Sequence, residues 1–89
     1  MNPVMMMKYQ RIKNLREAKN LTQADVGSAI NVAQRIYAYY ESGERRIPTY
    51  VLVALAEFHG TSVDYLMELT DEPVPYKRRK KTKKHTPGD

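Results

Sequence analysis

The chain has 89 residues, a formal net charge of +5 and no cysteine. A chain of this length allows one small domain, whose modest core calls for well-formed helices or a partner chain, and the lack of cysteine excludes disulfides, thiolate zinc sites and thiol catalysis. No apolar run approaches the roughly 20 residues that span a bilayer, and the apolar stretch at the start is too short for a signal peptide, so we expect a cytoplasmic protein without membrane contact.

Residues 8–19 form the first predicted element, a helix. Ile12 and Leu15 share one apolar face at helical spacing, charged residues occupy most other positions, and Asn20 ends the pattern. Residues 1–7 contain four methionines and one proline without any periodicity. We interpret them as a flexible N-terminal arm.

The apolar pattern predicts two short helices, at residues 23–30 and 33–41, separated by a tight turn. The first helix begins at a capping signal formed by two side chains. The Thr22 hydroxyl can accept a hydrogen bond from an exposed backbone amide, and the Asp25 carboxylate, three residues later, favours the positive end of the helix.

The turn between these helices is predicted from two residues with unusual backbone freedom. Gly27 lets another backbone segment approach closely, and Asn31 is one of the few non-glycine types that tolerate a left-handed conformation. Ala33, in contrast, supplies no capping side chain for the helix that follows. Two short helices joined in this way have the layout of a helix-turn-helix.

Residues 49–59 predict a fourth helix, which starts after Pro48 and is ended by Gly60. This helix is apolar on nearly all sides, so another part of the protein or a partner is expected to cover it. Two interpretations remain open: a core helix shielded by the next helix and the tail, or a two-fold dimer contact. The residues of the possible dimer contact are Tyr50, Val51, Val53 and Ala54.

A fifth helix is predicted over residues 62–69. Ser62 is its expected N-cap, and Leu66 and Leu69 are expected to help close the core. His59, at the end of the preceding helix, fits a packed or surface histidine better than a metal ligand, because no second ligand lies at metal-binding spacing. We therefore expect no metal site.

The chain divides into a domain of residues 8–70 and a basic tail of residues 71–89. Seven of the fifteen basic residues fall within eight consecutive positions of the tail, and the rest of the chain holds eight basic and ten acidic residues. The positive charge is therefore a property of the tail, and it does not by itself indicate that the domain binds nucleic acid. The cations of the tail are Lys77, Arg78, Arg79, Lys80, Lys81, Lys83 and Lys84.

The high charge and the lack of apolar residues predict that the tail is disordered when it is alone. Three roles for it remain open. The tail can bind phosphates without sequence preference, it can act as a nuclear localisation segment in a eukaryotic source, or it can simply keep the protein soluble.

Four motifs give the chain a resemblance to a known family. They are RIKNLRE at residues 11–17, LTQ at 21–23, YESG at 40–43 and GTSVDYL at 60–66. With these motifs, residues 8–69 resemble the lambda-repressor, Cro and Xre-type helix-turn-helix family. The resemblance implies an all-α fold, a compact five-helix lambda-repressor-like DNA-binding domain with the helix-turn-helix at its second and third helices. The chain departs from the family's common residues at Asn20, Asn31 and Ala33, and it has tyrosines, Tyr37 and Tyr40, at apolar positions of the second helix of the motif.

The resemblance also implies a structural ion pair and a base-reading surface. The family's L-R arginine pairs with the glutamate that ends the recognition helix, here Arg16 and Glu41, and this pair fixes the angle between the first and third helices. With Tyr37 and Tyr40 facing the core, the opposite side of the third helix would enter the major groove. The base-reading candidates are Gln34, Arg35, Ala38 and Tyr39. Alternatively, these four residues are simply the polar face of a helix that is exposed to solvent.

Phosphate contacts are expected on either side of this surface. Gln23 resembles the family's phosphate-clamping glutamine, which lies at the positive end of a helix. Arg11, Arg45 and Arg46 are further phosphate candidates by position, and each is also compatible with a solvated surface charge.

No motif in the chain supports catalysis, so we expect a protein that is not an enzyme and needs no cofactor. The resemblance implies a sequence-specific transcriptional regulator, most simply a repressor of phage, mobile-element or bacterial origin, that binds double-stranded DNA as a homodimer. The alternative is an antitoxin or protein-interaction adaptor that uses the same fold to bind a protein partner, with the basic tail binding nucleic acid non-specifically.

Overall fold

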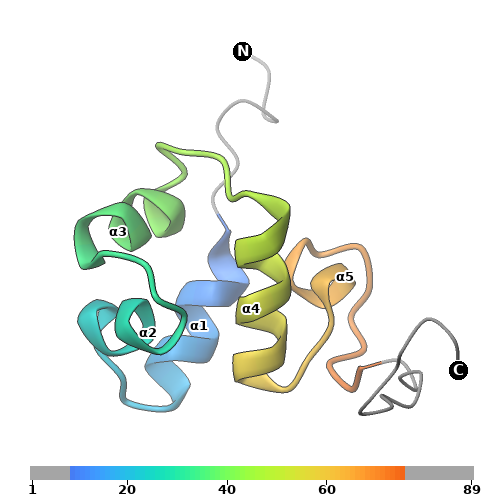
Figure 1. Cartoon of the computed structure of the whole chain (residues 1–89). Coiled ribbons are helices and arrows are strands. Elements are labelled where there is room, and N and C mark those ends of the chain that lie inside the picture. The colour runs from blue at the N-terminus through green and yellow to red at the C-terminus, as the bar shows by residue number, and fades with distance from the viewer. Residues whose placement is uncertain (1–8, 76–89) are drawn as a thin grey trace, which may run out of the picture.

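A computed structural model describes residues 9–75 and folds them into five helices without any strand (Figure 1). The helices are α1 (Gln10–Ala18), α2 (Gln23–Ala29), α3 (Gln34–Ser42), α4 (Thr49–His59) and α5 (Val63–Leu66). In Figure 1, α4 stands in the middle, with α1, α2 and α3 on one side and α5 on the other. This arrangement confirms the predicted all-α, five-helix fold class.

One buried apolar cluster joins all five helices. Tyr37 and Tyr40 belong to it, which fixes the side of α3 that faces the core. On α4, the buried positions follow one helical face, as expected for a helix that packs with that face against its neighbours. The cluster consists of Tyr9, Ile12, Val26, Tyr37, Tyr40, Ile47, Val51, Leu52, Leu55, Ala56 and Leu66.

The start of α2 has the predicted capping box. The Asp25 backbone amide donates to the Thr22 hydroxyl at 3.0 Å, and the Thr22 amide donates to the Asp25 carboxylate at 2.8 Å. Each side chain therefore satisfies a backbone donor that the helix itself leaves without a partner.

The turn between α2 and α3 confirms both predictions about backbone freedom. Asn31 is left-handed, with a φ of 62°. The Val32 amide donates to the Gly27 carbonyl at 2.8 Å, and a Cβ added at Gly27 would lie only 2.6 Å from the Val32 carbonyl oxygen. The short distance between the two backbone segments explains why a glycine occupies this position of α2.

The ends of the other helices follow their predicted residues with one exception. Asn20 and Gly43 are left-handed after α1 and α3, with φ of 58° and 85°, and α4 ends at Gly60 as expected. The exception is α5, which stops at Leu66 instead of continuing to residue 69. Its end is followed by a left-handed Glu68.

The prediction that Leu69 helps to close the core is wrong, because this residue is 74% exposed. The early end of α5 turns the chain away from the core before Leu69 is reached. Leu66 does take the predicted place, because it is almost fully buried. The N-cap of this helix is also as predicted, since the Ser62 hydroxyl accepts a hydrogen bond from the Tyr65 amide at 3.0 Å.

Arg11 binds the chain that follows α5. Its Nη1 atom donates to the carbonyl oxygens of Tyr65 and Thr70 at 2.9 and 2.6 Å, and its Nη2 atom lies 2.7 Å from the Asp71 carboxylate. The guanidinium also stacks over the Tyr65 ring, 4.1 Å from its centroid. One side chain of α1 thus holds both the end of α5 and the start of the segment after it.

Residues 70–75, here called the C-terminal strap, are part of the folded domain. Besides its contacts with Arg11, the strap accepts a hydrogen bond from the Thr61 hydroxyl at the Pro73 carbonyl, and its last residue, Pro75, lines a hollow together with residues of α4 and the start of α5. Polar side chains of distant elements therefore hold the strap, which begins at residue 70, the expected end of the domain.

The predicted N-terminal arm (1–7) and the cations of the tail (77–84) lie outside the described residues. Within residues 9–75, no helix is both long enough and apolar enough to cross a membrane.

Gly27→Ala should lower the free energy of unfolding by about 1–3 kcal/mol, because the new methyl group would overlap a backbone oxygen that cannot rotate away. Urea unfolding of both proteins measures the difference. Gly60→Asn is the matched control, since its side chain meets open space and asparagine tolerates the left-handed φ of 70°. A Gly27→Ala protein as stable as the wild type would contradict the close packing of α2 against the turn.

Candidate nucleic-acid interface

An ion pair between α1 and α3 holds the two helices together. Arg16 Nε lies 2.6 Å from Glu41 Oε2, and Arg16 Nη2 lies 3.0 Å from Glu41 Oε1, so the pair is bidentate. The side chains are only 13% and 4% exposed. Arg16 also donates to the Leu21 carbonyl at 2.9 Å, and the Gln23 amide donates to Glu41 at 3.2 Å. These contacts connect the end of α3 to α1 and to the start of α2.

The environment of this pair keeps both groups charged. Burial opposes ionisation of Glu41, but the hydrogen bonds from Arg16 and Gln23 outweigh it and lower the pKa of Glu41. The hydrogen bond to Glu41 likewise raises the pKa of Arg16. Because the lowered pKa belongs to an acid, the pair stabilises the fold above the ordinary glutamate value of 4.5, and this contribution is lost as the pH falls through the lowered pKa.

The outer side of α3 carries the four residues expected to read bases. Gln34 and Arg35 are exposed, whereas Ala38 and Tyr39 are half-buried. The Arg45 guanidinium lies 4.9 Å from the centroid of the Tyr39 ring, and the Arg45 backbone amide donates to the Tyr39 carbonyl at 3.2 Å. Tyr39 is therefore positioned by the connection after α3, and it forms the edge of this side of the helix.

The four phosphate candidates do not share one environment. Arg45 and Arg46 are exposed in the connection between α3 and α4. Gln23 is half-buried at the start of α2, with its amide directed to Glu41. Arg11 lies elsewhere, since it is bound to the C-terminal strap. The structure thus brings three of the four candidates near α3, and gives Arg11 a role inside the domain.

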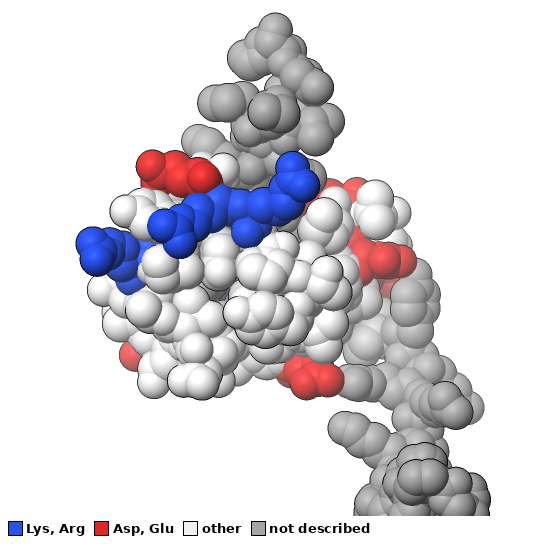
Figure 2. Space-filling view, turned by 45° about the horizontal axis from the view of Figure 1, so that its top comes forward, with Lys and Arg blue, Asp and Glu red and all other residues white. Residues whose placement is uncertain are grey.

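Figure 2 brings forward the end of the molecule where the α3–α4 connection lies in Figure 1. Basic side chains form a row across this face, and the acidic side chains lie around its margins. A row of cations can attract the negatively charged backbone of a nucleic acid, although residues 9–75 as a whole hold seven basic and nine acidic side chains.

A polar hollow beside α3 joins residues of the predicted site to a side of α1 that the prediction left out, formed by Gln10, Lys13 and Glu17. It has a volume of about 510 Å³ and is lined by Gln10, Lys13, Arg16, Glu17, Gln23, Ala38, Glu41 and Ser42. The α1 residues in this list recur at helical spacing on one polar side of the helix. That spacing was a signal in the sequence, but the sequence does not reveal which other helix this side faces.

The apolar side of α4 is divided between the core and the surface. Tyr50 is 75% exposed and Val53 is also exposed, and Ala54 is half-buried. Our prediction that Val51 belongs to the possible dimer contact is wrong, because Val51 is only 1% exposed and faces the core.

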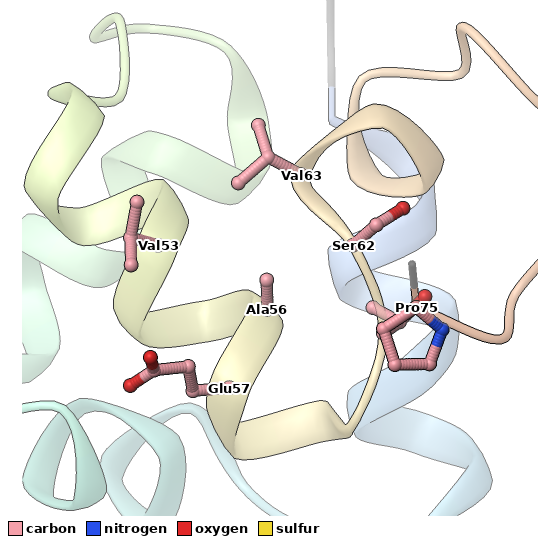
Figure 3. A pocket seen from close by; sticks show the side chains of 7 residues that line it. Val53, Ala56, Glu57, Ser62, Val63 and Pro75 are labelled. Atoms are coloured by element: carbon pink, nitrogen blue, oxygen red, sulfur yellow. The ribbon is translucent and has the colours of Figure 1, made fainter. Parts of the chain in front are cut away.

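Next to this surface, a hollow of about 180 Å³ lies between α4, the start of α5 and the end of the C-terminal strap. Figure 3 shows Val53, Ala56 and Glu57 of α4 on one side of it, and Val63 and Pro75 on the other. The hollow is lined mainly by apolar side chains and opens beside the exposed part of α4.

The environment of His59 is that of a packed side chain. Burial, with a smaller contribution from the nearby Lys19 ammonium, lowers the pKa of His59 to about 4. Its Nδ1 atom lies 3.0 Å from the Lys19 Nζ atom, and its ring packs edge to face against Phe58. Within residues 9–75, no group of three or more histidine, cysteine, aspartate or glutamate side chains could hold a metal ion.

Comparison with known proteins gives two matches. The profile of the helix-turn-helix family matches residues 12–66, a region that runs from α1 to the end of α5. The chain is also 39% identical over 77 residues to a Bacillus subtilis (strain 168) protein named "Uncharacterized HTH-type transcriptional regulator YobD", and the match covers 86% of this chain and 69% of that protein. No solved structure matches the chain.

Arg16→Met should lower the free energy of unfolding by about 3–5 kcal/mol, because it leaves the Glu41 carboxylate buried without its cation. The double variant Arg16→Met/Glu41→Leu should recover most of this loss, since it removes both charges together. Arg46→Met, which alters an exposed arginine, is the control and should stay within about 0.5 kcal/mol of the wild type. Equal losses in the single and double variants, measured by urea unfolding, would show that the charge itself is unimportant.

Proposed function

Because the chain belongs to the helix-turn-helix family of the lambda-repressor type, we propose that it is a DNA-binding transcriptional regulator that lays α3 in the major groove of double-stranded DNA. The observation that carries the proposal is the division of α3 into two sides. Tyr37 and Tyr40 anchor one side in the core, and the opposite side presents Gln34 and Arg35 to solvent.

The exposed side of α3 has the chemistry needed to distinguish base pairs. Arg35 can donate two hydrogen bonds to guanine O6 and N7, and Gln34 can pair with adenine in a similar two-bond geometry. Ala38 offers a small apolar surface for a thymine methyl group. Tyr39, which is held under Arg45, is suited to a phosphate or to a base at the edge of the groove.

Phosphate contacts would fix the position of α3 without reading sequence. We assign this role to Arg45 and Arg46, which are exposed next to α3, and to Gln23 at the start of α2. We leave Arg11 out of the interface, because its guanidinium already donates to the Tyr65 carbonyl of α5 and to the C-terminal strap. The cations of residues 77–84 would add non-specific attraction to the DNA backbone.

We propose that the regulator binds as a homodimer through the exposed side of α4. Tyr50 and Val53 are large apolar side chains in contact with solvent, and a second copy of the chain would cover them. A two-fold dimer would bind an inverted repeat whose half-sites lie about 34–36 Å apart, one turn of the double helix. A dimer bound in this way would exclude other proteins from the same DNA, so repression is the simplest consequence of binding.

The same α4 surface also supports a second candidate function. If a different protein covers Tyr50, Val53 and the adjoining apolar hollow, the chain would act as an antitoxin or an adaptor that uses this fold to hold its partner. In that case the basic tail would be responsible for binding nucleic acid. The experiment below separates the two candidates.

Selection of bound sequences from a random pool of duplexes, at about 0.15 M salt, should enrich one inverted repeat. The full chain and a version that ends at Pro75 should recover the same repeat, because the base-reading residues all lie on α3. Arg35→Ala should relax the preference at one or two base positions, whereas Arg46→Ala should weaken binding to all sequences alike. The regulator proposal fails if neither version enriches a sequence, and binding confined to the full chain would favour the adaptor.

Val53→Glu should weaken the homodimer, because the proposed contact would bury the new carboxylate without a partner. Analytical ultracentrifugation of the full chain across a range of concentrations measures the shift from dimer to monomer. Leu69→Glu is the matched control, since it places the same charge on another exposed apolar residue outside α4. A wild-type chain that stays monomeric, or equal shifts in both variants, would count against α4 as the contact.

A further inference from the structure

The polar hollow lies between α1 and the face of α3 that we propose reads bases. On α3, the half-buried Ala38 and the exposed Ser42 line it, and they continue the row of positions that starts at the exposed Gln34, each four residues from the last. The hollow therefore borders the proposed DNA-reading surface directly.

The opposite wall is one side of α1. Gln10, Lys13 and Glu17 are spaced three and four residues apart, so they follow one another along the helix surface. All three are exposed to solvent. The side of α1 that lines the hollow is therefore free to meet a molecule that approaches α3.

The charges around the hollow are not equivalent. Arg16 and Glu41 line it and bind each other, and Glu17 lies 3.9 Å from the Arg16 guanidinium. Lys13, in contrast, forms no ion pair with any of residues 9–75. Its ammonium is the cation of the hollow that is available to an anion from outside.

We propose that this hollow receives a backbone phosphate of the DNA strand that runs beside α3, and that Lys13 binds this phosphate. The inference rests on the proposed placement of α3, because a helix in the major groove is bordered by the sugar-phosphate strands. A volume of about 510 Å³ is ample for one phosphate group. With Lys13, α1 becomes part of the interface, in addition to the two helices of the motif.

Salt titration tests this role with a variant and a control of equal charge. Lys13→Gln in the full chain should reduce the slope of log affinity against log salt by about 0.9, the value for one phosphate contact, and should weaken all duplexes by a similar factor. Lys19→Gln removes the same charge from the far end of α1, where Lys19 lies against His59 and Phe58, and should leave the slope unchanged. Glu17→Gln removes a negative charge from the same hollow, so this variant should raise the affinity for DNA instead of lowering it.

A second experiment locates the contact. The selected operator is prepared as a set of duplexes, each with one phosphate replaced by a neutral methylphosphonate. One replacement next to the sequence read by α3 should weaken the wild type but have no further effect on Lys13→Gln, while Lys19→Gln keeps the wild-type pattern.

Each result decides between the two proposals. Equal slopes for the Lys13 and Lys19 variants, or a methylphosphonate pattern that Lys13→Gln leaves unchanged, would overturn the role of Lys13 while the wild type still binds its operator. A wild-type chain without any sequence preference would overturn the proposed function, and the assignment of Lys13 with it. Circular dichroism of the variants confirms that the folds being compared are the same.

Discussion

The buried ion pair between Arg16 and Glu41 is the constraint on which the geometry of the motif depends. It connects the last turn of α3 to the last turn of α1, and the same two side chains bind the Leu21 carbonyl and the Gln23 amide at the approach to α2. A bidentate pair is directional, so it restricts the rotation of α3 as well as its distance from α1. The direction of the outer side of α3 follows from this contact and from the buried Tyr37.

The distribution of charge explains why the total charge says little about the domain. The basic excess belongs entirely to residues outside the described part of the chain, because residues 9–75 hold seven basic and nine acidic side chains. Within the domain, individual cations have different environments. Arg11 and Arg16 are used internally, whereas Arg45 and Arg46 remain exposed beside α3. In the function that we propose, the domain therefore binds DNA through a few well-placed cations. It does not require a surface that is positively charged throughout.

The C-terminal strap and the exposed side of α4 form a second region, separate from the outer side of α3. Arg11 and Thr61 hold the strap against the domain, and Pro75 closes one side of the apolar hollow next to Val53. A partner bound at this surface would lie next to Pro75, which precedes the basic residues of the tail.

The sequence alone determined the features that depend on near neighbours: the capping box, the left-handed Asn31 and the glycine that α2 needs at the turn. Such features require only a hydrogen bond or a backbone angle within a few residues. The family motifs also predicted the distant partner of Arg16. Only the tertiary structure decided that Leu69 is exposed, that Arg11 binds the strap and that Lys13 faces α3. Burial and charge partners depend on which elements pack together, and helical spacing alone does not specify that.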